Sequence, residues 1–242
     1  MSADNLTIER DDTIAILTFN RPEVLNAFNN PLMKQTLEEV AKLNADDTVR
    51  AIVVRGAGRA FSPGFDLKAS ADRKMEGVQD WERQMKLQFD FIMQFWYSPK
   101  PTIAAVHGYC IAGAFELALA CDVTIAAQNT RLGEPEVRFG TGIVAMLLPW
   151  VTGPKQAKEL LLTGEDKLSA DDALRIGIVN QVVPDGEAFD TAMSVAKSMA
   201  NAAERSVTFT KRAINETYET MGFGRALRAS LDLDVLLNAA TD

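Results

Sequence analysis

The chain has 242 residues, of which 47% are hydrophobic and 24% charged, the profile of a globular protein with one large domain or a domain plus a helical appendage. Its net charge of −8 argues against nucleic acid as the main partner, although an anionic small ligand needs only a local basic patch. The single histidine, His107, argues against a zinc site, so we expect no metal.

Two features of the sequence bear on its location. The first five residues lack the basic and apolar regions of a signal peptide. Cys110 and Cys121 would lie about 16 Å apart if one helix carried both, which is too far for a disulfide. Two reduced thiols and no leader predict a cytoplasmic protein.

Short apolar runs bounded by glycine, proline or acidic residues predict the strands of the fold. They cover residues 7–9, 14–19, 51–56, 103–106, 123–126 and 178–183. The first two runs predict a hairpin, because Asp11 and Asp12 between them suit a turn.

Longer segments with capping signals predict the helices. They cover residues 30–44, 81–97, 112–121, 154–162, 169–176, 187–201, 206–218 and 224–238. We expect Asn30 to cap the first of them, with Pro31 in its first position. The polar segment at residues 68–80 predicts a mobile loop.

The pattern of elements changes near the C-terminus. Strands and helices alternate up to about residue 185, and only helices follow. We therefore divide the chain into an α/β body at residues 1–195 and a helical region at residues 196–242.

The apolar segment from Thr102 to Ala127 is long enough to suggest a membrane span. His107, Glu116 and Asp122 interrupt it, which indicates a strand, a helix and a strand buried inside the protein. We expect no association with a membrane. His107 itself ends an apolar strand, a position more typical of a structural histidine than of a catalytic one.

Two glutamates are the strongest candidates for catalysis. Glu116 lies among Ala, Leu and Phe, where a carboxylate loses its hydration unless it is paired, protonated or used. The alternative is a first-turn acid that answers the helix dipole. Glu136 follows in Gly-Glu-Pro-Glu, a segment that by itself also fits an acidic turn on the surface.

Glycines near these acids leave backbone N–H groups uncovered. Gly113 lies where we expect a helix to begin, and the free amides of a helix N-terminus favour negative charge. A second glycine-rich loop, residues 56–67, follows a strand directly; it is either an anion-binding loop or a plain turn. Buried carboxylates beside free amides suggest proton transfer next to a stabilised oxyanion.

Five segments, in the same order and at similar spacing, resemble the crotonase (enoyl-CoA hydratase/isomerase) superfamily. They are residues 20–27 (NRPEVLNA), 60–67 (AFSPGFDL), 107–122 (HGYCIAGAFELALACD), 133–137 (GEPEV) and 173–184 (ALRIGIVNQVVP). The resemblance covers nearly the whole chain. It implies a mixed α/β fold, a spiral of strand-strand-helix units with a C-terminal helical region used in trimer assembly.

The resemblance also implies an acyl-CoA thioester as the ligand, with coenzyme A as part of the substrate and no separate cofactor. By position, the oxyanion-hole amides would be those of Ser62 and Gly113. The residues expected to line the substrate path are Leu25, Ala60, Gly64, Phe65, Asp66, Leu67, Ala112 and Pro135. Arg21, Arg59 and Lys68 are candidate contacts for the phosphates.

Hydratases of this superfamily use two glutamates, and Glu116 and Glu136 occupy both positions. The resemblance therefore implies an enoyl-CoA hydratase, in which Glu136 exchanges a proton with carbon and Glu116 activates water. The alternatives are a double-bond isomerase of the same fold and a non-catalytic acyl-CoA-binding subunit. A homotrimer or a dimer of trimers is the expected assembly.

Overall fold

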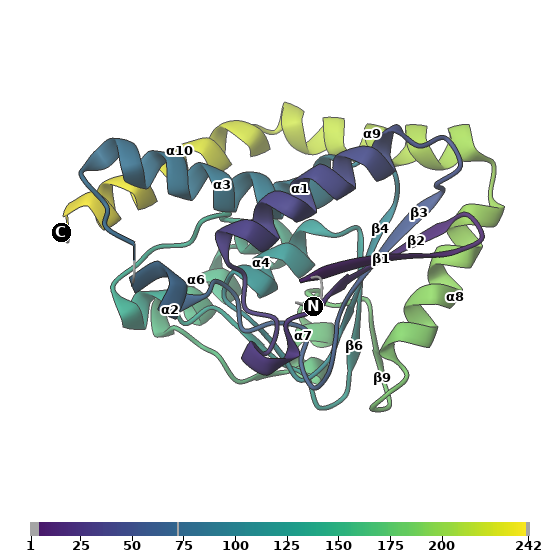
Figure 1. The fold of residues 1–242 in the computed structure, drawn as a ribbon, viewed down its shortest axis with the longest axis horizontal. Coiled ribbons are helices and arrows are strands. Elements are labelled where there is room, and N and C mark those ends of the chain that lie inside the picture. Colours follow the sequence, from purple (N-terminus) through teal and green to yellow (C-terminus); the bar gives the residue numbers. More distant parts are fainter. Residues whose placement is uncertain (1–4, 72, 241–242) are drawn as a thin grey trace.

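The computed structural model describes residues 5–71 and 73–240 and is built around a six-stranded sheet (Figure 1). Its strands, in spatial order, are β1 (Leu6–Asp11), β2 (Ile14–Phe19), β3 (Ala51–Gly56), β4 (Thr102–Val106), β6 (Val123–Ala127) and β9 (Gln181–Val183). β1 and β2 form the predicted antiparallel hairpin, and every other neighbouring pair is parallel.

A second, three-stranded sheet holds β5 (Tyr109–Ile111), β7 (Arg131–Gly133) and β8 (Leu168–Ser169). β4 and β5 are followed by helix α4 (Gly113–Ala120), and β6 and β7 are followed by further helices. Successive strand-strand-helix units therefore place one strand in each sheet, which is the predicted spiral.

Helices surround the two sheets. The remaining helices are α1 (Asn30–Ala45), α2 (Leu67–Ala71), α3 (Val78–Tyr97), α5 (Leu148–Thr152), α6 (Pro154–Thr163), α7 (Ala170–Arg175), α8 (Ala188–Asn201), α9 (Glu204–Thr220) and α10 (Phe223–Ala240), with 3-10 turns η1 (Pro22–Val24) and η2 (Glu136–Phe139). Gly164 ends α6 in the left-handed conformation.

The large sheet is buried on both faces, which explains why its strands are continuous apolar runs. On one face, Ile14, Val53 and Ile103 pack against small residues of α8. The other face packs into the main core with α1, α3 and α4. All residues of α4 are buried, so this short helix lies in the middle of the protein.

Two sequence-based expectations are corrected. The residue that caps α1 is Asn29, whose side chain accepts a hydrogen bond from the Leu32 N–H, while Asn30 is already the first helical residue. The segment predicted as a loop at residues 68–80 holds most of α2 and the start of α3. Residue 72 of this segment lies outside the described residues.

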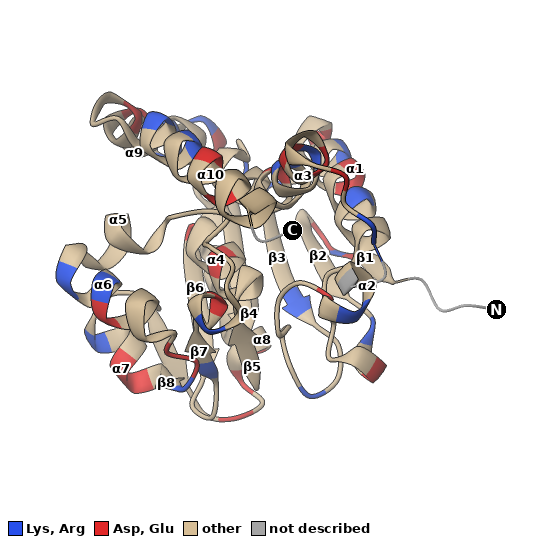
Figure 2. Ribbon diagram, turned by 90° about the vertical axis from the view of Figure 1, so that its left-hand side faces the viewer, with Lys and Arg blue, Asp and Glu red and all other residues tan. Residues whose placement is uncertain are grey.

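The C-terminal helices do not act as one unit. α8 packs on β3, β4 and β6, whereas α10 packs along α3. α9, which precedes α10 in the chain, lies at the same side of the molecule (Figures 1 and 2). The predicted division after residue 195 falls inside α8. A division of the chain after Asn201 would keep α8 with the sheet that it covers.

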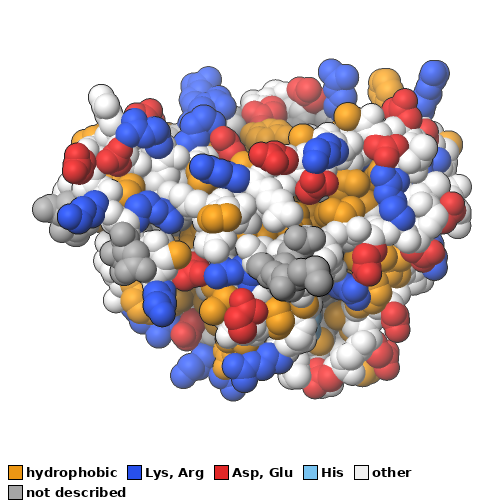
Figure 3. All heavy atoms as spheres, in the orientation of Figure 1, with side chains coloured by type: hydrophobic (Ala, Val, Ile, Leu, Met, Phe, Trp, Pro, Cys, Tyr) orange, Lys and Arg blue, Asp and Glu red, His pale blue; other side chains and the backbone are white. Residues whose placement is uncertain are grey.

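The described residues also show how charge is distributed, whether a helix could span a membrane, and the state of the cysteines. On the face drawn in Figure 3, lysine and arginine side chains are interspersed with acidic ones. In residues 5–71 and 73–240, no helix has the length and apolar character that a membrane span requires. Cys110 and Cys121 are both buried and free.

Candidate active site

The site is built around the N-terminus of α4. Ala112 precedes this helix with φ 60° and ψ −139°, a backbone conformation that residues other than glycine rarely adopt. Its N–H donates to the carbonyl oxygen of Gly133 at 2.8 Å, which ties the start of α4 to the end of β7. The strained residue stands directly before Gly113, and it sets the direction of the first N–H groups of the helix.

Two backbone amides at this point have no acceptor among the described residues, those of Phe65 and Gly113. As the first residue of α4, Gly113 has no partner one turn earlier in the helix. A Cβ built on Gly64 would lie 3.0 Å from the Gly113 nitrogen, so the two loops are in close contact. The neighbouring amides of Phe65 and Gly113 therefore form a candidate oxyanion hole.

The amide predicted for Ser62 does not belong to this pair. Ser62 is fully buried, and its N–H donates to the Tyr109 carbonyl oxygen at 2.9 Å. The Ser62 hydroxyl donates to the carbonyl of Asn26 and accepts from the N–H of Gly64. Ser62 thus shapes the loop, and its amide is already engaged, whereas that of Phe65 is free to receive an acceptor.

Glu116 lies in the first turn of α4 and is 1% exposed. Its Oε2 accepts a hydrogen bond of 2.6 Å from the N–H of Ala145, while Oε1 has no partner in the described part of the chain. The Ala145 contact fixes the carboxyl, and the unpaired oxygen is free to bind a reactant. Glu116 does stand in the first turn, but its burial and its bond to Ala145 go beyond the alternative of an acid that only answers the helix dipole.

Glu134 and Glu136 are brought in by the end of β7. Gly133 runs so close to the carbonyl of Glu165 that a Cβ at this position would collide with it, and the Glu134 N–H donates to the same oxygen at 2.8 Å. Pro135 then turns the chain into η2, of which Glu136 is the first residue. Both glutamates are buried, so this segment is not an acidic surface turn.

The three carboxyls meet inside the protein, since one oxygen from each of Glu116, Glu134 and Glu136 lies within 4.8 Å of the others. Burial, together with the charge of Glu136, raises the pKa of Glu116 well above its ordinary value. Burial and the same neighbour raise the pKa of Glu134 in the same way. Burial also raises the pKa of Glu136, to about 7, although a hydrogen bond with Glu134 opposes this.

A fourth acid approaches from α10. Asp234 is 3% exposed; its Oδ1 accepts from the N–H of Gly142 at 3.0 Å and from the side chain of Asn238 at 2.7 Å. Its charge adds to the rise in the pKa of Glu116 and of Glu136. The C-terminal helix therefore contributes directly to the electrostatics of the site.

The three glutamates are also the one group of three potential metal ligands in residues 5–71 and 73–240. With one oxygen from each, they would supply at most half of the six ligands that Mg²⁺ or Ca²⁺ requires. They provide no nitrogen or sulfur, which zinc prefers. This chemistry suits the holding of protons better than the holding of a cation.

The residues predicted to line the substrate path fall into three groups. Gly64, Phe65 and Ala112 lie at the two free amides, since a Cβ built on Gly64 would lie 2.7 Å from that of Ala112 and one built on Gly113 would lie 2.5 Å from Cε2 of Phe65. Ala60 and Pro135 are both buried, and Pro135 stands between Glu134 and Glu136 in the chain. Leu25, with φ 56°, ends η1 and is partly exposed, and Leu67 is 67% exposed at the start of α2.

Asp66 belongs to a separate pair. It accepts a hydrogen bond from Arg21 at 3.0 Å. Burial alone would raise the pKa of Asp66, but the Ala69 N–H and Arg21 hold it below its ordinary value. Arg21 is thereby engaged inside the protein, whereas Arg59 and Lys68, the other candidate phosphate contacts, are exposed.

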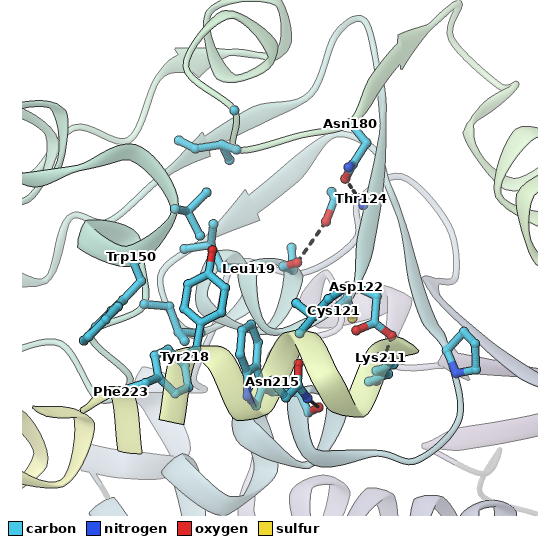
Figure 4. Close-up of a pocket in the computed structure, with 18 of the residues that line it drawn as sticks. Leu119, Cys121, Asp122, Thr124, Trp150, Asn180, Lys211, Asn215, Tyr218 and Phe223 are labelled. Carbon is cyan, nitrogen blue, oxygen red and sulfur yellow. Dashed lines mark hydrogen bonds and ion pairs between the residues drawn. The ribbon is translucent and has the colours of Figure 1, made fainter. Parts of the chain in front are cut away.

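A cavity of about 570 Å³ lies beyond the other end of α4, between that helix, α5 and α9 (Figure 4). Lys211 points toward Asp122 on its wall, and Trp150, Tyr218 and Phe223 close one side. None of the three glutamates lines it. Its size alone therefore does not make it the reaction site.

Sequence reasoning missed three features: the free amide of Phe65, the burial of Glu134, and Asp234. Glu134 was visible as the first acid of Gly-Glu-Pro-Glu, but a glutamate beside proline is usual on surfaces. Asp234 interrupts the apolar positions of the last helix, as Glu116 does in α4. That interruption was the available signal.

A family model described as enoyl-CoA hydratase/isomerase matches residues 9–237. This chain belongs to the enoyl-CoA hydratase/isomerase family. Crotonyl-CoA hydratase of Syntrophomonas wolfei is 32% identical to it over 248 residues, which cover 100% of the chain and 93% of the relative. The short-chain-enoyl-CoA hydratase of Clostridium acetobutylicum is 34% identical over 221 residues, covering 89% of the chain and 82% of the relative.

Solved structures of the family have the same fold as this chain. The crystal structure of an enoyl-CoA hydratase/isomerase from Xanthobacter autotrophicus Py2 superposes with a TM-score of 0.96 at 44% identity, covering 99% of this chain and 89% of that one. A probable enoyl-CoA hydratase from Mycobacterium smegmatis gives a TM-score of 0.91 at 30% identity, covering 99% and 96%. The predicted resemblance and fold class are thus confirmed.

Proposed function

We propose that this protein is an enoyl-CoA hydratase that adds water across the double bond of a 2-enoyl-CoA thioester. The observation that carries the proposal is the meeting of Glu116 and Glu136, two buried carboxyls with oxygens within 4.8 Å, beside two unpaired backbone amides. The names of the relatives from Syntrophomonas wolfei and Clostridium acetobutylicum support the same reaction.

The amides of Phe65 and Gly113 would receive the thioester carbonyl oxygen. As hydroxide adds to C3, negative charge develops on that oxygen, and two fixed N–H groups stabilise the enolate without reorganisation. Each such donor typically contributes about 3–4 kcal/mol to transition-state stabilisation. The positive end of the α4 dipole, at Gly113, acts in the same direction.

The two glutamates divide the proton transfers. Glu116, held by Ala145 through Oε2, uses Oε1 to accept a proton from water as the water oxygen bonds to C3. Glu136 gives its proton to C2, and the electrons of the enolate form the new C–H bond. One water is consumed and one proton moves from Glu136 to C2 while another arrives on Glu116. A pKa of about 7 suits Glu136 to both giving and accepting protons near neutral pH.

Two other functions remain to be distinguished. A double-bond isomerase of this family needs a group that exchanges the C2 proton but no water-activating base, so the fixed and half-unpaired Glu116 favours the hydratase. A non-catalytic acyl-CoA-binding subunit would have no need of buried acids that destabilise the fold.

The test is a panel of 2-enoyl-CoA thioesters of different chain length and branching, followed at the absorbance of the conjugated double bond. Loss of absorbance with formation of a 3-hydroxyacyl-CoA supports the hydratase. Migration of the double bond without uptake of water supports the isomerase, and tight binding without turnover supports the binding subunit.

The chain is also proposed to assemble as a homotrimer or a dimer of trimers. α9 and α10 expose large apolar side chains, among them Phe209 at 66%, Leu233 at 69% and Leu236 at 58%. Light scattering on the intact chain and on a deletion of residues 206–242 tests this. The deletion should be monomeric or insoluble, and a soluble, active trimer would refute the assignment.

Two buried, unpaired cysteines are in keeping with a cytoplasmic location.

A further inference from the structure

Glu134 is the member of the glutamate cluster that the proposed reaction does not use. Its backbone is clamped by the hydrogen bond to Glu165 and by the close approach of Gly133 to the same carbonyl. Its side chain is 1% exposed, and one of its carboxyl oxygens lies within 4.8 Å of one of Glu136. Burying this acid costs stability, so its place beside Glu136 requires a reason.

The three carboxyls differ in the N–H groups that they receive. Glu116 accepts from Ala145, and Glu136 accepts from its own backbone N–H; both contacts favour an ionised carboxyl. In the part of the chain that the structure describes, each of the three has one carboxyl oxygen without a partner, but only the Glu134 side chain receives no N–H at all. Because like charges this close cannot all ionise, the proton belongs on the carboxyl with the least support for charge, which is Glu134.

We propose that Glu134 is a positioning residue that stays protonated and donates a hydrogen bond to Glu136, so that Glu136 is held in place and its carboxylate, left once the proton has moved to C2, is stabilised. The inference rests on the proposed function for the role of Glu136, but the contact between the two carboxyls is a property of the protein without substrate.

The other charged and titratable groups around the pair act against ionisation. Asp234 approaches from α10, and Glu116 from α4, each with a negative charge when ionised. Cys110 of β5 faces Glu134, and burial holds the pKa of this thiol above its ordinary value. The hydrogen bond from Glu134 is therefore the principal side-chain contact that lowers the pKa of Glu136.

A matched pair of substitutions separates this role from packing. Glu134→Gln keeps the length of the side chain and an N–H donor, whereas Glu134→Met keeps the length and removes the donor. Glu159→Gln, at an exposed position of α6, controls for the loss of a glutamate as such. The ¹³C signals of the glutamate carboxyls, followed by NMR against pH in the free protein, give the titration midpoint of Glu136 in each variant.

We expect the midpoint of Glu136 to stay within about half a pH unit in Glu134→Gln and to rise by about one unit or more in Glu134→Met. Wild type should also show a second carboxyl that titrates above Glu136 and that is missing from Glu134→Gln. The loss of this signal identifies Glu134 as the protonated carboxyl even if the methionine variant does not fold. Equal midpoints in the two variants, or a fall of the midpoint in Glu134→Gln, would show that Glu134 is not the proton holder.

Two further measurements complete the test. Added Mg²⁺ or EDTA should leave the carboxyl titrations unchanged, and a shift of the three signals with Mg²⁺ would mean that the cluster binds a cation instead. Exchange of the C2 protons of butyryl-CoA in D₂O should follow the ionisation of Glu136 in every variant. If the midpoints behave as expected but no exchange or hydration occurs, the proposed function fails while the role of Glu134 stands.

Discussion

The two ends of α4 hold acids in opposite electrostatic settings. At its N-terminal end, Glu116 lies beside two further glutamates, and no cation of the described residues pairs with any of them. Just beyond its C-terminal end, Asp122 lies 2.7 Å from the Lys211 ammonium of α9. Helix α4 thus separates a cluster of like charges from an ion pair.

The ion pair has the features of a structural contact. Lys211 donates to Asp122 and to the carbonyl oxygens of Phe95 and Lys100, and these three bonds saturate its ammonium. They join α9 to α3 and to the entry of β4. The glutamate cluster has the reverse features, with unpaired oxygens and raised pKa values, which are typical of a reaction site. Whether an acid has a cation as its partner, or only other acids, indicates its role.

The sharpest way to break this comparison is to substitute the glutamates of the cluster. Glu136→Gln should lose hydration by at least about 10²–10⁴-fold, together with exchange of the C2 proton, because both reactions need its proton transfer. Glu116→Gln should lose hydration by about the same factor but retain measurable C2 exchange into a saturated acyl-CoA, because only hydration needs the activated water. Normal hydration by Glu116→Gln would make Glu116 structural and favour the isomerase.

The N-terminus of α4 allows a second test, of the amide rather than the acids. Gly113→Pro removes the N–H, and Gly113→Ala keeps it; both add a Cβ that would lie 2.5 Å from Cε2 of Phe65. A proline fits the first position of a helix, so the fold should survive. We expect the proline variant to be about 10²–10³-fold slower than the alanine variant in the hydration assay. Equal rates in two folded variants would place the oxyanion hole elsewhere.

The opposite end of α4 should respond in stability instead of activity. Lys211→Met leaves Asp122 without its cation, and removal of one member of a buried pair typically costs several kcal/mol. Because the Asp122 side chain is 23% exposed and water can reach it, we expect a loss of about 3 kcal/mol in the free energy of unfolding by urea. The double variant with Asp122→Asn should recover part of this loss.

Activity is the control for that experiment. The folded fraction of Lys211→Met should hydrate at a rate close to wild type, because Lys211 lies at the far end of α4 from the glutamates. A large fall in turnover per folded molecule would show that the ion pair is part of the catalytic machinery, and the contrast between the two ends would no longer hold.

The sequence predicted the strands of the large sheet and the central helix, because their signals are local, but it missed the three short strands β5, β7 and β8 of the second sheet. Apolar runs, the glycine at Gly164 and the proline at Pro31 each act on their own segment. It also predicted that Glu116 is buried, since its neighbours in α4 are all apolar. The capping residue of α1 was missed by one position because Asn29 and Asn30 are chemically the same.

The remaining features depend on contacts between distant segments. Whether the Ser62 amide is free is decided by Tyr109, 47 positions away in the chain, which accepts its hydrogen bond. Glu134 is buried because Glu165 receives its N–H and because Gly133 can approach that loop. Asp234 reaches the site only because α10 packs along α3. Local sequence patterns carry no information on such contacts between distant segments.

The smallest effect that sharpens the comparison is the dependence of stability on pH. The pKa of Glu136 rises from 4.5 to about 7 on folding, so the folded state binds its proton more tightly than the unfolded state. This contribution to stability is fully present below pH 4.5 and is lost as the pH rises through about 7. A single group with this shift would account for about 3 kcal/mol, but the neighbouring carboxyls share the proton, so we expect about 1–2 kcal/mol from one substitution. The free energy of unfolding by urea of Glu136→Gln should therefore equal that of wild type at pH 5 and exceed it by that amount at pH 8.5. The free energy of unfolding of Glu159→Gln should follow that of wild type at both pH values. Parallel curves for all three proteins would mean that the cluster is not strained by its charges and that the two ends of α4 differ less than their contacts indicate.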